Sequence, residues 1–116
     1  IKIQDTISDN ASCGVYVLGD AEIDPTGLDM ANLEIKVYKN SALISEGQGS
    51  AVQGNPLTAV AWLANTLGAF DIPFLAGEVI LSGSLVPLEP VQRGDKMHLE
   101  LSGAGIESCT ASCNFV

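Results

Sequence analysis

Basic residues are scarce in this 116-residue sequence, which has five Lys and Arg against fourteen Asp and Glu. The net charge of −9 excludes nucleic acid as an expected partner, because neutralisation of phosphates by Lys and Arg dominates such binding. It also argues against binding to anionic membranes. No apolar run approaches the roughly 20 residues that span a bilayer, and no signal peptide is recognisable. We therefore expect a cytoplasmic protein without a nucleic-acid or membrane partner.

Histidine and cysteine are also few, with His98 alone and Cys13, Cys109 and Cys113. An odd cysteine count in an apolar chain is not typical of a secreted disulfide scaffold. Cys109 and Cys113 are four strand steps apart, roughly 13 Å, which is too far for a disulfide. His98 alternates with apolar neighbours and is expected to face solvent rather than act as a base. These donors are too few to predict a metal site in this chain.

Disorder is excluded by a composition that is 47 % hydrophobic and only 16 % charged. The length corresponds to one domain or part of a larger one and allows a chain to bury roughly two thirds of its unfolded surface. The chain begins without Met, and its first residues already resemble structured sequence. We expect residues 1–116 to form a single unit that is a portion of something longer.

Alternating apolar and polar residues predict several short strands. A tight connection at residues 39–41 predicts a hairpin, and the polar stretch from Asp5 to Gly14 is expected to be a loop. Turns are expected at residues 24–27 and 93–95 because of their Pro, Gly and Asp content. The expected strands are 15–18, 33–38, 42–45, 78–82, 97–101 and 108–115.

One helix is predicted over about residues 56–69. Asn55 is a typical N-cap, and Pro56 suits the first helical position. The apolar residues between Leu57 and Leu67 form a broad face that we expect to pack in the core, and the helix should end before Pro73. The predicted fold class is α+β, β-rich, with one main helix.

Common catalytic motifs are missing from the sequence. It contains no phosphate-binding glycine loop and no nucleophile elbow, and its carboxylates are scattered without the spacing of a calcium loop. Two polar segments remain, residues 9–14 and 82–84. Hydroxyls beside glycine let a ligand approach backbone N–H groups. The alternative is that each segment is a turn that satisfies its own backbone.

These polar segments carry a family resemblance that covers nearly the whole chain. The sequences DNASCGVYVLG (residues 9–19), GNPLTAVAWLA (54–64), GEVILSGSL (77–85) and GD (94–95) resemble the C-terminal part of 2-keto-4-pentenoate hydratases (2-hydroxypenta-2,4-dienoate hydratases). These enzymes belong to the fumarylacetoacetate hydrolase superfamily. The resemblance implies a mixed β-roll with flanking helices, and it makes residues 1–116 the C-terminal portion of a larger catalytic domain. The family often has His where Asn55 stands.

The resemblance also implies a reaction and a cofactor. Water would add to 2-hydroxypenta-2,4-dienoate to give 4-hydroxy-2-oxopentanoate, in the meta-cleavage degradation of aromatic compounds. The complete enzyme, a homo-oligomer, would use Mg²⁺ or Mn²⁺ to chelate the 2-oxo acid and stabilise the enolate. The family's metal carboxylates precede the matched region. We therefore expect no metal site in this chain, and no activity from it alone.

The site residues implied by the resemblance form the rim of a substrate pocket. Ser82 and Gly83 match the T/S-G motif that binds the substrate carboxylate, and Asn10 and Ser12 match the D-N-A-S segment that lines the pocket. The related 4-oxalocrotonate decarboxylases share both segments, although residues 82–90 and Cys13 favour the hydratase. A second alternative is a non-catalytic, β-rich assembly unit, because the metal ligands are absent.

Overall fold

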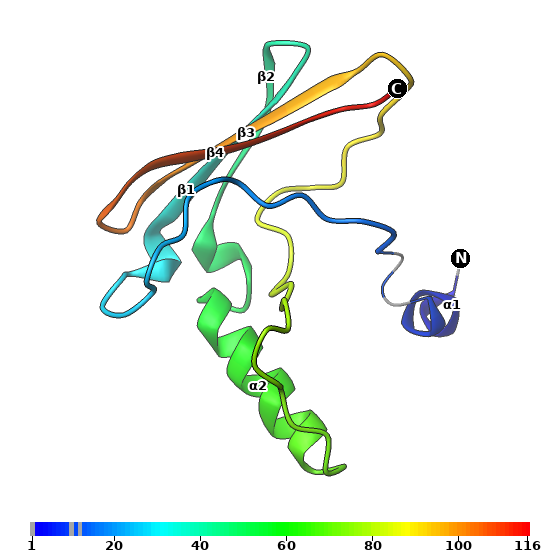
Figure 1. Ribbon diagram of the computed structural model, residues 1–116, viewed down its shortest axis with the longest axis vertical. Coiled ribbons are helices and arrows are strands. Elements are labelled where there is room, and N and C mark those ends of the chain that lie inside the picture. The colour runs from blue at the N-terminus through cyan, green and yellow to red at the C-terminus, as the bar shows by residue number, and fades with distance from the viewer. Residues whose placement is uncertain (1, 10, 12) are drawn as a thin grey trace.

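The computed structural model describes residues 2–9, 11 and 13–116. Its centre is an antiparallel sheet with the strand order β2-β1-β3-β4 (Figure 1). The hairpins β1–β2 and β3–β4 are joined by pairing between β1 and β3. The predicted β-rich α+β class is confirmed, and the described sheet is open rather than closed on itself. The strands are β1 (Leu33–Lys39), β2 (Ala42–Gln48), β3 (Lys96–Gly103) and β4 (Ile106–Asn114).

The predicted hairpin at residues 39–41 is confirmed. Asn40 and Ser41 both have positive φ, 52° and 70°, as a two-residue turn between right-twisted strands requires. Strand β2 continues to Gln48, so its expected end at residue 45 is wrong. Gly47 pairs with Ile35 inside the strand, and the Leu85 carbonyl lies where a Cβ of residue 47 would be.

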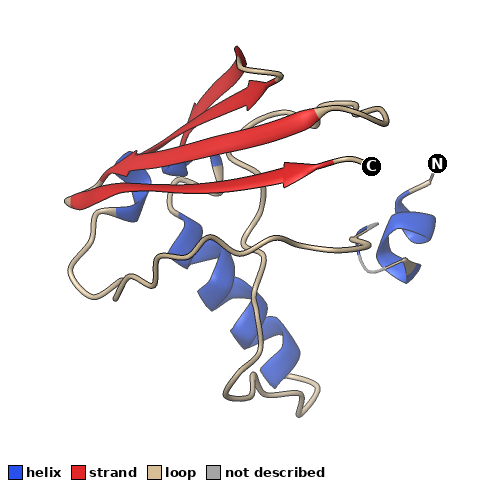
Figure 2. Cartoon of the chain, turned by 45° about the horizontal axis from the view of Figure 1, so that its top comes forward, coloured by secondary structure: helices blue, strands red, loops and turns tan. Residues whose placement is uncertain are grey.

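Helix α2 (Pro56–Gly68) is confirmed together with its start signal, since Asn55 Oδ1 accepts a hydrogen bond from Leu57 N at 2.9 Å. The expected packing of its whole apolar face is wrong. Only Pro56 and Ala59 are buried, and Trp62 is 58 % exposed, because the helix extends away from the sheet (Figures 1 and 2). Among the described residues, no helix has the length and apolar character needed to cross a membrane.

A short helix, α1 (Ile3–Ser8), lies where a loop was expected. The Asp5 carboxylate accepts a hydrogen bond from Lys2 N at 2.9 Å, so it satisfies a backbone donor at the helix start. This capping contact stabilises α1. The helix has only six residues, which is too short for a helical repeat of apolar residues to be recognised in the sequence. Two further one-turn 3-10 helices, η2 (Met30–Asn32) and η3 (Gly49–Ala51), flank the β1–β2 hairpin.

The strands expected at residues 15–18 and 78–82 are not formed. Both segments run as loops without a ladder partner, and an apolar sequence becomes a strand only where another strand lies beside it. The first segment nevertheless lies close to the sheet, because Thr110 O is 2.6 Å from the point where a Cβ on Gly19 would lie. In Figure 1 this segment crosses near β4.

The core lies between one face of the sheet and the start of α2. Its most buried apolar residues are Leu33, Val37, Val52 and Ala59. Along β4 the half-buried and exposed residues alternate, as predicted for a half-buried strand. The three cysteines are free thiols, which agrees with the predicted absence of a bond between Cys109 and Cys113.

A polar cluster fastens the turn at residues 92–95 to the β1–β2 hairpin. The Asp95 carboxylate is 14 % exposed and lies 3.0 Å from Lys39 Nζ. It accepts hydrogen bonds at 2.8 Å from Asn40 Nδ2 and from Gln92 N. These bonds, Asn40 first, and the nearby ammonium group lower the Asp95 pKa to about 2. The predicted turn at 93–95 is therefore held by long-range contacts as well as by its own geometry.

This lowered pKa predicts how stability depends on pH. A carboxyl group whose pKa falls on folding stabilises the fold above its ordinary value of 3.8, and the contribution is lost as the pH falls to about 2. We expect Asp95→Asn to lower the unfolding temperature at pH 6 and to flatten its decline between pH 4 and pH 2. Asp20→Asn removes the same charge from an exposed bend and should leave the wild-type profile. Identical profiles for the two variants would contradict the prediction.

Candidate functional site

Ser82 and Gly83 lie on the chain segment that passes between α2 and the sheet. Ser82 is half-buried. Gly83 has φ 127°, and a Cβ there would lie 3.2 Å from Val52 Cγ1, so this backbone favours glycine on both counts. The Ser84 hydroxyl bonds to Val86 O within its own turn. Within the described residues, no hydrogen bond engages the Ser82 hydroxyl.

A cavity of about 520 Å³ opens along the segment that precedes Ser82, and neither Ser82 nor Gly83 is among its described lining residues. Cys13, which follows Ser12, and Leu81, which precedes Ser82, both line it. Two segments far apart in the sequence therefore meet at one hollow. Asn10 and Ser12 themselves lie outside the described residues. The other lining residues are Ala11, Leu63, Phe74, Glu78, Val79 and Ile80.

Most side chains that line the cavity are apolar, although polar atoms also contribute to its surface, and the one charged side chain among the described lining residues is the Glu78 carboxylate. Glu78 Oε2 accepts a hydrogen bond from Leu75 N at 2.9 Å, so a local turn holds the carboxylate. The apolar pattern of residues 57–67 predicts that Leu63 packs in the core, and no sequence motif points to Phe74 or Glu78. The apolar pattern could not distinguish a cavity wall from a packed core, because both need the same side chains.

The described residues do not fit a metal ion. No three His, Cys, Asp or Glu side chains in that part of the chain are close enough to one another to hold one. Glu78 is the only carboxylate on the cavity wall, and a hard divalent cation needs several oxygen ligands held together. No reaction step can therefore be derived from a metal held by these residues.

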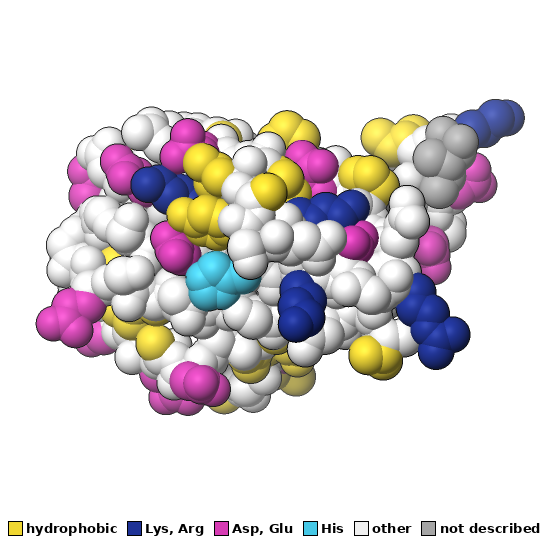
Figure 3. Space-filling view, turned by 90° about the horizontal axis from the view of Figure 1, so that it is seen from above, with side chains coloured by type: hydrophobic (Ala, Val, Ile, Leu, Met, Phe, Trp, Pro, Cys, Tyr) yellow, Lys and Arg dark blue, Asp and Glu magenta, His cyan; other side chains and the backbone are white. Residues whose placement is uncertain are grey.

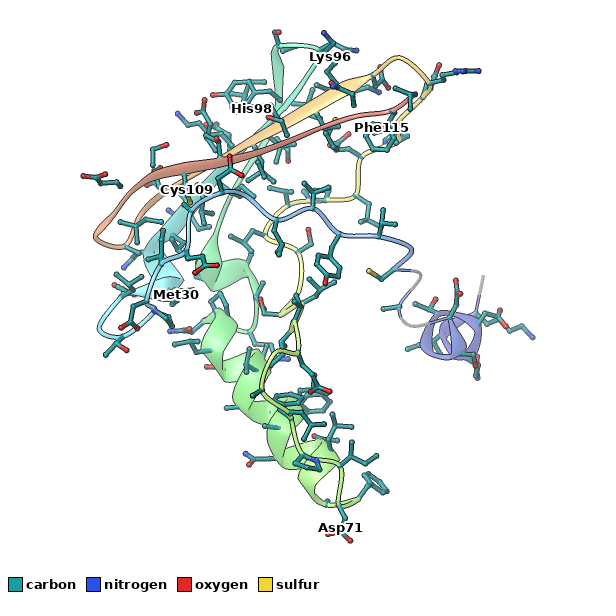
Figure 4. The ribbon with its side chains drawn as sticks, viewed as in Figure 1. Met30, Asp71, Lys96, His98, Cys109 and Phe115 are labelled. Carbon is teal, nitrogen blue, oxygen red and sulfur yellow. The ribbon has the colours of Figure 1, made fainter. Side chains whose placement is uncertain are left out.

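His98 lies on the outer face of the sheet, as predicted (Figures 3 and 4). Its Nδ1 is 2.8 Å from Ser112 Oγ, and its Nε2 is 3.5 Å from Glu100 Oε1. Tyr38 Oη donates to Glu100 Oε2 at 3.2 Å. Partial burial and this carboxylate raise the Tyr38 pKa. The four side chains form a cross-strand network beside a hollow of about 380 Å³, on the face opposite Val37.

Comparison with known proteins identifies the family. Residues 2–111 match the model described as the fumarylacetoacetate (FAA) hydrolase C-terminal family. The chain therefore belongs to the fumarylacetoacetate hydrolase family. The resemblance on which the site residues rested is thereby confirmed at the level of the family.

Individual relatives include several hydratases. The chain is 59 % identical over 105 residues to 2-hydroxyhexa-2,4-dienoate hydratase of Comamonas testosteroni, a match covering 90 % of this chain and 40 % of that protein. It is 45 % identical over 105 residues to 2-keto-4-pentenoate hydratase of Paraburkholderia xenovorans, with 90 % and 39 % covered. The chain thus spans about two fifths of the length of these curated relatives.

Solved structures support the fold. The structure of 4-oxalocrotonate decarboxylase from Pseudomonas putida G7, complexed with calcium and acetate, superposes with a TM-score of 0.66 at 33 % identity. The superposition covers 77 % of this chain and 33 % of the decarboxylase. The same enzyme complexed with magnesium and adipate gives the same TM-score. Divalent cations are thus bound by structural relatives of this chain.

Proposed function

We propose that this chain forms the C-terminal portion of the catalytic domain of a hydratase. The enzyme would add water to 2-hydroxypenta-2,4-dienoate, or to a homologue with a longer tail, to give a 4-hydroxy-2-oxo acid. The observation that supports this proposal is the cavity at which Cys13 and Leu81 meet, because these residues are the chain neighbours of Ser12 and Ser82, to which the resemblance assigned substrate contacts. The names of the relatives at 59 % and 45 % identity support the same reaction.

In this proposal the chain's own residues bind and orient the substrate. The Ser82 hydroxyl donates a hydrogen bond to the substrate carboxylate, and Gly83 allows the backbone after it to adopt a positive φ while packing against Val52. Asn10 and Ser12 supply further neutral donors, as the resemblance implies. Mg²⁺ or Mn²⁺ belongs to the complete enzyme, and its ligands are proposed to lie outside the residues described here.

A second candidate is the decarboxylation of 4-oxalocrotonate. It is favoured by the superposition on the decarboxylase at 33 % identity, and both polar segments are shared with that enzyme class. The hydratase is preferred because the relatives at higher identity carry that name. The two candidates differ in a measurable product, since only decarboxylation releases CO₂.

A chimeric enzyme tests the proposed function. The aligned segment of the Comamonas testosteroni hydratase would be replaced by this chain, and loss of dienoate absorbance would be followed with Mg²⁺. We expect the chimera to hydrate the dienoate, and we expect the isolated 116-residue chain to bind Mn²⁺ weakly at most and to show no turnover. A folded but inactive chimera would contradict the proposal, as would turnover by the chain alone.

Self-association is a further expectation for the isolated chain. Large apolar side chains are strongly exposed, including Leu88 at 94 %, Val15 at 88 % and Phe70 at 71 %, and such surface usually marks a contact with another protein. We propose that the functional protein is a homo-oligomer and expect the sedimentation coefficient to rise with concentration. Val15→Ser combined with Phe70→Ser should weaken this dependence. A monomer at every concentration would contradict the expectation.

A further inference from the structure

Strand β4 is an edge of the described sheet, with β3 on one side only. Phe115 N donates to Asp95 O at 2.9 Å, so odd-numbered residues here bond towards β3. The bonding direction alternates along an antiparallel strand, and the peptide groups of Thr110 and Ser112 therefore point to the free side. In agreement with this, Thr110 O lies 2.6 Å from the point where a Cβ on Gly19 would be.

Residues 15–23 follow this free edge in the antiparallel direction. Figure 4 shows the segment passing beside the labelled Cys109, which shares a hollow with Ala21. As the residue number rises along the segment, it falls along β4. The neighbouring residues, in order, are Val17 with Cys113 at a hollow of about 210 Å³, Gly19 with Thr110, and Ile23 with Ile106 at a hollow of about 360 Å³.

The segment approaches β4 without forming a ladder. Among the described residues, no backbone–backbone hydrogen bond involves residues 15–23, and the two hollows lie on either side of the Gly19 contact. Its large apolar side chains are exposed, with Leu18 at 69 % and Val17 at 53 %. Pairing with β4 would satisfy peptide groups of both segments and would cover part of this apolar surface.

The side-chain pattern selects one register for that pairing. The odd-numbered residues from 15 to 23 are all apolar or glycine, whereas Asp20 and Glu22 are charged. The half-buried residues of β4 between 109 and 113 are also odd-numbered. Residues that face each other on neighbouring strands lie on one face of the sheet, and a slip of one residue would reverse every side chain. Gly19 is therefore placed opposite Ala111.

We infer that residues 15–23 are a strap that closes on the free edge of β4 as a fifth, antiparallel strand, with Gly19 opposite Ala111. This inference does not depend on the proposed function. It bears on the cavity because Ala11 and Cys13, which line it, come shortly before the strap. A closed strap fixes that wall of the cavity, and it covers an edge that would otherwise be open to pairing with other chains.

Amide exchange in the 116-residue chain tests the strap and its register. In this register Leu18 and Asp20 lie opposite Ser112 and Thr110, so their N–H groups bond to β4, whereas the N–H group of Val17 points away. After correction for intrinsic rates, we expect the amides of Leu18 and Asp20 to exchange at least about tenfold more slowly than that of Val17. NMR spectra at several protein concentrations measure these rates.

Two results of this measurement would overturn the inference. Equal exchange at the three amides would mean that no ladder forms. Slow exchange that appears only as the protein concentration rises would mean that a second copy, rather than the strap, pairs with the edge of β4.

A pair of proline variants tests the same register by removing one donor at a time. Leu18→Pro removes an N–H group that would bond to β4, and it should restore fast exchange at Asp20. Val17→Pro removes an N–H group on the outer side, where an edge strand tolerates proline, and it should keep the slow exchange. Equal effects of the two variants at Asp20 would overturn the register. Slow exchange at the β1–β3 ladder shows that a variant is folded, and the wild-type pattern decides if Leu18→Pro does not fold.

The methyl NMR signals of Leu63 and Val79 test the link to the cavity, because both residues line it together with Cys13. We expect Leu18→Pro to shift these signals and Val17→Pro to leave them in place. A folded Leu18→Pro variant with released strap amides and unshifted methyl signals would overturn the positioning of the cavity wall by the strap.

Discussion

Gly47→Ala is expected to destabilise the fold by about 1–3 kcal/mol, the usual cost of forcing extra volume into a packed site. The added Cβ would overlap the Leu85 carbonyl, and a backbone atom cannot rotate away as a flexible side chain can. The segment that carries Ser82 would have to move with Leu85. The midpoint of urea unfolding measures the effect.

Gly68→Ala is the matched control for this substitution. A Cβ on Gly68 meets no atom within 4 Å, and alanine is the better helix former. We expect this variant to be as stable as the wild type or slightly more stable. A loss of stability for Gly47→Ala no larger than that of Gly68→Ala would show that the contact with Leu85 does not restrict residue 47.

Ser82→Ala in the chimeric hydratase is expected to weaken substrate binding by about 1–3 kcal/mol. This is the usual cost of leaving a buried acceptor without its donor. KM should rise, while the unfolding temperature should change little, because the half-buried hydroxyl forms no hydrogen bond within the described residues. Steady-state kinetics and a thermal scan of the same preparation give both quantities.

Ser84→Ala is the control for this second prediction. The Ser84 hydroxyl bonds to Val86 O, 2.5 Å away, so its loss should lower stability and leave KM unchanged. Unchanged kinetics in Ser82→Ala with a lowered unfolding temperature would mean that Ser82 is structural. The site assignment taken from the resemblance would then be wrong.

Sequence patterns correctly predicted those features whose interacting residues lie close together in the chain. Asn55 and Pro56 predicted the start of α2 because capping is decided within one helical turn. The connection at residues 39–41 predicted its hairpin for the same reason. The alternation around Cys109 predicted which face of β4 is half-buried, because the period of a strand follows from its backbone geometry.

Distant contacts could not be predicted from the same patterns. Residues 15–18 and 78–82 have the composition of strands, but strand formation depends on a partner that the segment itself does not specify. The length of β2 depends on the absence of a side chain at Gly47, which allows Leu85 to pass close by. Trp62 and the other apolar residues of α2 predicted a buried helix, although the described structure covers only part of that face.

The sequence by itself determined the helix, the hairpin at residues 39–41, the outward direction of His98 and the family resemblance that singled out Asn10, Ser12, Ser82 and Gly83. Each of these depends on residue types at short spacing or on motifs in order along the chain. Only the tertiary structure decided that Cys13 and Leu81 meet at one cavity, and that Glu78 is the charged group on its wall. The physical reason is that a cavity is formed by side chains brought together by folding, and the spacing of residues within one segment does not record where another segment will pack.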